Sequence, residues 1–85
     1  MRQEHIRKEI LMQCYASRPL ALGGYRIARD AAKAGYDYTR LEVDQELDFL
    51  EGEGLIALVP QPGSALKVYK ISSGGVRHYE QNFQA

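Results

Sequence analysis

The chain has 85 residues, a single cysteine and a formal net charge of zero. A chain of this length forms one domain, residues 1–85, and buries roughly 60–65% of its unfolded surface, which leaves little room for an enclosed active site. The sequence has no histidine and cysteine set at metal-ligand spacing and no catalytic-triad motif, so we expect no enzymatic activity, metal or cofactor. The longest apolar run, residues 55–59, is too short to span a bilayer, and the amino terminus lacks the apolar segment of a secretion signal. Both features favour a soluble, cytoplasmic protein without a membrane partner.

The zero net charge hides a strong segregation of charge along the chain. Residues 1–36 carry seven basic and three acidic side chains (+4), residues 37–54 carry one and seven (−6), and residues 55–85 carry three and one (+2). Such segregation predicts a surface whose faces differ in sign.

Two amphipathic helices are predicted in the first part of the chain. Apolar residues recur about every four positions over Gln3–Ala16, which indicates a helix that ends at the segment SRPLALGG. Cys14 lies on its apolar face, so a buried thiol is expected rather than a nucleophile. A second helix is expected over Tyr25–Ala34 and is ended by Gly35. Its core-facing residues are predicted to be Ile27, Ala31 and Ala34.

A third helix is expected to begin at Thr39 and to run to Glu51. Thr39 and Glu42 have the spacing of a capping box, in which each side chain accepts a hydrogen bond from the other residue's backbone N–H. One apolar face of this helix is predicted to be core: Val43, Leu47 and Leu50.

The remaining sequence predicts two strands and a last helix. Leu55–Val59 and Leu66–Ile71 have the composition of strands and flank PQPGS, residues 60–64, which is typical of a turn. Residues 72–75, SSGG, mark another break, and a helical stripe then leads to the carboxyl terminus. The expected fold is mainly α with a small antiparallel β-hairpin, in the order α-α-α-β-β-α.

The stretches VDQELDFLEGEGLI and YKISSGGVRHYE resemble signatures of MarR-, ArsR- and PadR-like winged helix-turn-helix regulators, and the match covers about residues 4–80. The chain is also similar, more loosely, to short winged-helix proteins of Mu-like phages. The resemblance implies a winged-helix fold in which the third helix, Thr39–Glu51, enters the major groove and the second helix crosses the DNA backbone. It also implies that a wing at Val59–Lys67 touches phosphates or the minor groove.

Basic residues of the second helix are candidate phosphate ligands. With its apolar residues facing the core, Arg26, Arg29 and Lys33 lie along one outward stripe at positions i, i+3 and i+7, which suits contacts with a DNA backbone. Lys67, near the expected wing, extends the basic character. A solvated helix face would present the same stripe, so this alternative stays open.

The third helix supplies the candidate base contacts. Thr39, Arg40 and Gln45 are expected to probe the major groove, and the amide of Gln45 can pair with adenine through two hydrogen bonds. The acidic side chains of the same helix oppose this role, because each would lie close to phosphates of like charge. The leading hypothesis is a DNA-binding transcriptional regulator with double-stranded DNA as its partner.

Apolar residues support a different hypothesis, a protein interaction module that does not bind DNA. Leu41 and Phe49 are expected on the outward side of the acidic third helix and could dock onto a basic protein partner, although Phe49 could equally pack into the core. Val76, Tyr79 and Phe83 share one face of the last helix. This face predicts a homodimer contact, unless it packs back onto the first helix.

Overall fold

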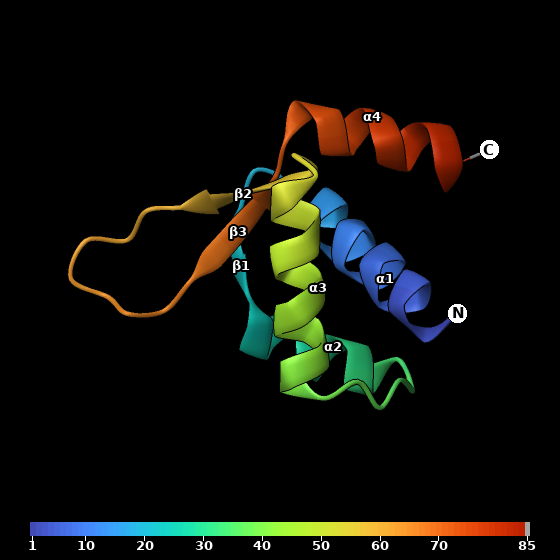
Figure 1. The fold of residues 1–85 in the computed structure, drawn as a ribbon, viewed down its shortest axis with the longest axis horizontal. Helices are drawn as coiled ribbons and strands as arrows, with labels where there is room; N and C mark the ends of the chain where they lie inside the picture. Colours follow the sequence, from blue (N-terminus) through green and yellow to red (C-terminus); the bar gives the residue numbers. More distant parts are fainter. Residues whose placement is uncertain (85) are drawn as a thin grey trace.

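The computed structural model describes residues 1–84 and consists of four helices and a small three-stranded antiparallel sheet (Figure 1). The elements in chain order are α1 (Arg2–Ala16), β1 (Leu22–Gly23), α2 (Gly24–Lys33), α3 (Arg40–Gly52), β2 (Ile56–Val59), β3 (Val68–Ile71) and α4 (Ser73–Asn82). The predicted fold class, mainly α with a small antiparallel sheet, is confirmed at this level.

The predicted two-stranded hairpin was incomplete, because the sheet has a third strand. The strand order is β1-β3-β2, with β1 pairing Leu22 to Tyr69 and Gly23 to Val68. The expected order α-α-α-β-β-α therefore lacked one element between α1 and α2. Leu22 is 2% exposed, so this short strand also contributes a side chain to the core.

Helices α1, α2 and α3 enclose the core together with the inner face of the sheet. The positions predicted to face inward are buried, with the exception of Ala34, which caps the end of α2 and is exposed. Cys14 is fully buried as predicted, and its burial raises the pKa of the thiol to about 11. The core residues are Ile6, Ile10, Leu11, Cys14, Leu22, Ile27, Val43, Leu47, Leu50, Ile56 and Tyr69.

The predicted capping box at the start of α3 is confirmed. The Thr39 side chain accepts a hydrogen bond from the backbone N–H of Glu42 at 3.1 Å, and the Glu42 carboxylate accepts one from the N–H of Thr39 at 3.0 Å. These bonds satisfy donors that an uncapped helix would leave free, which fixes where α3 begins.

The loop between β2 and β3 is longer than predicted. Strand β3 begins at Val68, not at Leu66, so residues 60–67 form the extended loop that projects from the sheet in Figure 1. Pro60 and Pro62 lack backbone N–H groups for a ladder, and Gly63 adopts a positive φ of 80°. The ladder therefore ends at the pair Val59 and Val68, and β3 begins two residues later than its composition indicated.

Helix α4 begins earlier than predicted, at Ser73. The hydroxyl of Ser72 caps it by accepting a hydrogen bond from the N–H of Gly75 at 3.0 Å. A Cβ at Gly75 would overlap the backbone oxygen of Leu55 and lie 2.7 Å from a side-chain carbon of Ile71. The glycine expected to break the chain thus lies in the first helical turn, where close packing requires it.

Candidate nucleic-acid interface

The three cations of α2 share the exposed side of that helix. Arg26, Arg29 and Lys33 are exposed, while the opposite side packs on the core. A carboxylate oxygen of Asp30 lies 3.8 Å from Nε of Arg26, and the other lies 3.4 Å from Nε of Arg29. Three cations and one carboxylate give this face a balance of +2. Exposed ion pairs of this kind are weak, so both guanidinium groups remain available to another anion.

Two carboxylates of α3 are turned toward α1 and are neutralised there. Arg2 holds Glu42 through two hydrogen bonds, from Nε at 2.6 Å and from Nη2 at 3.0 Å. Arg7 Nε donates to Glu46 at 2.6 Å, and the Glu46 side chain is only 10% exposed. Helix α1 lies beside α3 in Figure 1, and the hydrogen bonds to Arg2 and Arg7 show that these two acids point toward α1, to the side of α3.

The contact with Arg2 shifts the ionisation of both partners. Hydrogen bonds from the Arg2 guanidinium and from the backbone N–H of Thr39 lower the pKa of Glu42 to about 2. The same carboxylate raises the pKa of Arg2 above its usual value. The pair therefore stays ionised over the whole neutral and mildly acidic range.

Two of the three residues predicted to probe the groove have local partners. Thr39 is occupied by the capping box, and Arg40 Nε donates to Asp44 at 3.1 Å. Gln45 is exposed, and its side chain makes no hydrogen bond with another residue of the described chain. The exposed row of α3, which we define by the side chains farthest from the core, consists of Leu41, Gln45 and Asp48.

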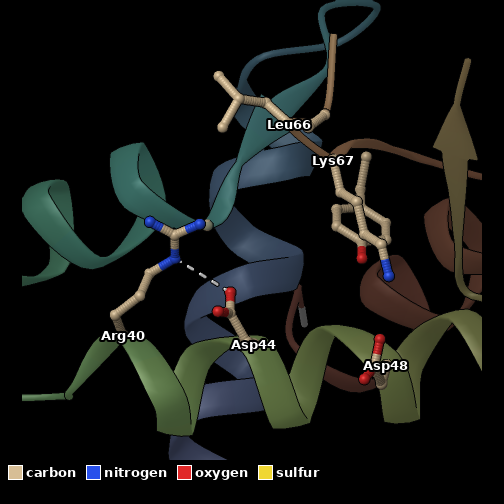
Figure 2. Close-up of a pocket in the computed structure, with 8 residues that line it drawn as sticks. Arg40, Asp44, Asp48, Leu66 and Lys67 are labelled. Atoms are coloured by element: carbon tan, nitrogen blue, oxygen red, sulfur yellow. Dashed lines mark hydrogen bonds and ion pairs between the residues drawn. The ribbon is translucent and has the colours of Figure 1, made fainter. Parts of the chain in front are cut away.

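A cavity of about 290 Å³ separates α3 from β3. Figure 2 shows Arg40, Asp44 and Asp48 rising from α3, with Lys67 approaching from the opposite side. Tyr69 also lines the cavity, and its burial, together with the nearby carboxylates of Asp48 and other α3 residues, raises the pKa of its phenol. Lys67 thus lies beside α3, as an interface built from both elements would need.

Leu41 and Phe49, the two apolar residues predicted on the outward side of α3, lie on different surfaces. Leu41 is 66% exposed on the first turn of the helix. Phe49 is 42% exposed, and the guanidinium carbon of Arg7 lies 3.7 Å from its ring centroid. Phe49 is therefore a partly covered residue on the α1 side of α3, and it does not belong to the core.

The predicted stripe on α4 is partly covered by α1. Tyr79 packs against Tyr15, with a distance of 4.5 Å between ring centroids, and both Val76 and Tyr79 are half-buried. Phe83 stays exposed and lines, with Phe49, a groove of about 480 Å³ between α1, the end of α3 and α4. Tyr79 therefore packs back onto α1, which was the alternative to a dimer contact.

Sequence reasoning missed the role of Arg2 and Arg7. Both were counted among the basic residues of the first segment, but no local spacing connects them to α3, because their carboxylate partners lie about forty residues later. The separation of charge between residues 1–36 and 37–54 was the available signal, since neighbouring segments of opposite sign attract each other.

Comparisons with known proteins do not assign a family. No family model matches the sequence, and no curated protein is significantly similar to it. Within residues 1–84, no helix has the length and apolar character needed to cross a membrane, and no three histidine, cysteine or acidic side chains gather as metal ligands. Function is therefore inferred from the geometry of the chain itself.

Proposed function

We propose that this chain is a non-enzymatic winged helix-turn-helix protein that binds double-stranded DNA and acts as a transcriptional regulator. The order of the elements supports this, because three helices precede the strands β2 and β3, whose projecting loop takes the place of a wing. Strand β1 completes the sheet beside them.

In this proposal, α2 binds the DNA backbone and α3 lies in the major groove. Arg26, Arg29 and Lys33 contact phosphates, and Lys67 adds a contact from the far side of α3. Gln45 is the residue of the exposed row best suited to a base, because its amide matches the donor and acceptor of adenine. Arg40 keeps its Nε bond to Asp44 and offers its other guanidinium N–H groups to a phosphate or a guanine.

The observation that carries the proposal is the sideways placement of the α3 carboxylates. A carboxylate about 7 Å from a phosphate costs about 0.6 kcal/mol in water before salt screening. Glu42 and Glu46 are instead held by arginines of α1, and Asp44 is held by Arg40. Asp48 is then the single carboxylate of the exposed row, and the face of α2, with its balance of +2, outweighs it; Glu51 and Glu53, which form no ion pair within residues 1–84, lie at the carboxyl end of α3.

Fluorescence anisotropy with a labelled 30-base-pair duplex of random sequence tests the proposal. Binding should weaken linearly on a log–log plot against salt, with a slope of roughly −3.6 for the four phosphate contacts. Arg29→Glu should lower the affinity strongly and reduce the magnitude of the slope by about 1. Arg77→Glu makes the same charge change at an exposed position of α4 and should have a much smaller effect.

Two results would contradict the proposal. Absence of binding at low salt would remove DNA as a partner. Equal losses from Arg29→Glu and Arg77→Glu would mean that the attraction is a property of the net charge, and α2 would have no special role.

Docking of a basic protein on α3 is the second candidate, and the exposed Leu41, on the same row as Asp48, favours it. Leu41→Ser should abolish capture of such a partner and leave the melting temperature almost unchanged, because the side chain is exposed. Phe49→Ala serves as the comparison, since Phe49 lies on the other side of the helix. Unchanged DNA affinity in Leu41→Ser, together with the absence of a captured partner, would exclude this candidate.

A further inference from the structure

A second cavity, of about 260 Å³, lies between α1 and the segment that joins α2 to α3. It is separate from the cavity between α3 and β3, and none of the residues proposed to contact DNA lines it. Its lining residues are His5, Lys8, Glu9, Met12, Tyr36 and Tyr38.

Glu9 is the unusual member of this cavity. It is only 8% exposed, and its single side-chain hydrogen bond comes from Nε2 of Gln13, which donates to Oε2 at 2.9 Å. No cationic side chain within residues 1–84 forms an ion pair with Glu9. Buried carboxylates are normally paired, because desolvation of an uncompensated charge is costly. Glu9 therefore lacks the counter-ion that its burial calls for.

Two aromatic rings face the same cavity. Tyr36 and Tyr38 are stacked, with 5.3 Å between ring centroids and an angle of 2° between ring planes. Burial, the neighbouring Tyr36 and the carboxylate of Glu9 all raise the pKa of the Tyr38 phenol, so the carboxylate and the rings share one environment. Tyr36 is 44% exposed and offers ring surface to a ligand.

The same chain twice combines a guanidinium with a carboxylate and an aromatic ring. These sets are Arg7 with Glu46 and Phe49, and Arg2 with Glu42 and Tyr38. Glu9 with Tyr36 has the carboxylate and an exposed ring but no guanidinium of its own, because Arg2 lies over Tyr38, the ring stacked on Tyr36. The nearest basic residue in sequence, Lys8, places its ammonium 5.4 Å from the ring centroid of Phe83, and Phe83 belongs to the other groove.

We propose that this cavity binds an external guanidinium group, either an arginine side chain of another protein or a free small guanidine. A guanidinium N–H donates to the Glu9 carboxylate, and the planar group stacks on the exposed ring of Tyr36. The volume lies below the range of pockets for drug-sized ligands, which suits one cationic head group. This site is independent of DNA binding, although Tyr38 directly precedes the Thr39 cap of α3.

Isothermal titration calorimetry and amide shifts in ¹H–¹⁵N spectra of the full chain test the proposal. Butylguanidine is the probe, and butylurea is its uncharged counterpart of similar shape. Butylguanidine should bind and shift the amides of Glu9, Tyr36 and Tyr38, whereas butylurea should not. A blocked Gly-Arg-Gly peptide forms the second arm: tighter binding than butylguanidine assigns the site to a protein arginine, and weaker binding assigns it to a free guanidine.

Three variants locate the binding. Glu9→Gln keeps an oxygen to accept the bond from Gln13 and should weaken butylguanidine binding by about tenfold or more. Tyr36→Ala should weaken it by roughly twofold to fivefold, and it provides a second measure if position 9 affects folding. Glu4→Gln, an exposed change on the same helix outside this cavity, should leave binding unchanged. Equal binding of butylguanidine and butylurea, no binding of either cation, or an unchanged affinity in Glu9→Gln would overturn the proposal.

Discussion

The ion pair between Arg7 and Glu46 should stabilise the fold more than any exposed pair in the chain. Replacement of Arg7 by Met removes a charge-assisted hydrogen bond of 2.6 Å to a carboxylate that is 10% exposed. Such bonds contribute about 1.5–3 kcal/mol, and we take about 1.5–2 kcal/mol here because the Arg7 side chain is 31% exposed to screening solvent. Loss of the contact with the Phe49 ring adds about 0.5 kcal/mol. The free energy of unfolding should therefore fall by about 2–2.5 kcal/mol.

A double-mutant cycle in urea, followed by circular dichroism, measures this interaction. The cycle uses Arg7→Met, Glu46→Met and the double variant, and it should give a coupling energy of about 1–2 kcal/mol. The control is a cycle of Arg40→Met and Asp44→Ala, because that pair is about half exposed and spans i to i+4 on one helix. Its coupling energy should be about 0.3–0.5 kcal/mol.

Equal coupling energies in the two cycles would refute the reasoning. Glu46 would then be solvated well enough to need no partner, and α1 would exert no particular hold on the acidic side of α3. A larger loss in Glu46→Met than in Arg7→Met would also count against it, because removal of the carboxylate leaves no buried charge unpaired.

Three further predictions concern packing, pH and thiol reactivity. Gly75→Ala should cost roughly 3 kcal/mol of unfolding free energy in urea, since the added methyl meets the backbone of Leu55. The pKa of Glu42 is lowered from 4.5 to about 2, so between these pH values the unfolded chain binds a proton that the native chain does not. The free energy of unfolding should therefore fall as the pH drops from about 4.5 to about 2. Arg2→Met should flatten this decline in acid titrations followed by circular dichroism. Cys14 is fully buried with a pKa of about 11, so Ellman's reagent at pH 8 should react with it quickly in urea and very slowly in the native protein.

The packing and pH measurements each have a control within the chain. Gly52→Ala adds a methyl group with no atom within 4 Å and should raise stability by up to about 1 kcal/mol, so a loss as large as that of Gly75→Ala would contradict the packing argument. Glu4→Gln should leave the acid decline unchanged. Rapid labelling of Cys14 under native conditions would show that the end of α1 opens readily.

Elements specified by local chemistry could be predicted from the sequence. The capping box of α3 needs only Thr39 and Glu42, three positions apart, and both of its hydrogen bonds are present. The core-facing positions of α1 and α3 follow from helical periodicity over a few turns, and they are buried. These signals succeed because the interacting residues are close in sequence.

Elements specified by distant partners could not be predicted. Strand β1 has two residues and exists because β3, far along the chain, supplies hydrogen bonds to Leu22 and Gly23. The start of α4 was misplaced for a similar reason, since Gly75 usually indicates a break but here permits contact with Leu55. A single sequence carries no local mark of either contact.

The candidate site was predicted only in part. The exposed stripe on α2 follows from periodicity, and the structure places Arg26, Arg29 and Lys33 on one exposed side of the helix. Their proposed role in binding phosphates stays a prediction. The hydrogen bonds that Thr39 makes in the capping box and Arg40 makes with Asp44 depend on side-chain rotamers, which helical periodicity does not specify.

The acidic segment shows why a charge balance along the chain differs from the charge of a surface. Residues 37–54 have a balance of −6, yet four of their seven carboxylates form ion pairs with arginines. Only one of those arginines lies in the segment, and the other two come from α1, which also packs against α3. The field near α3 is therefore set by the three carboxylates that are unpaired within residues 1–84, Asp48, Glu51 and Glu53, and by the cations of α2 and Lys67, because fields of tightly paired charges fall off faster with distance than those of single charges. An acidic sequence can thus belong to a helix whose outward side carries little net charge.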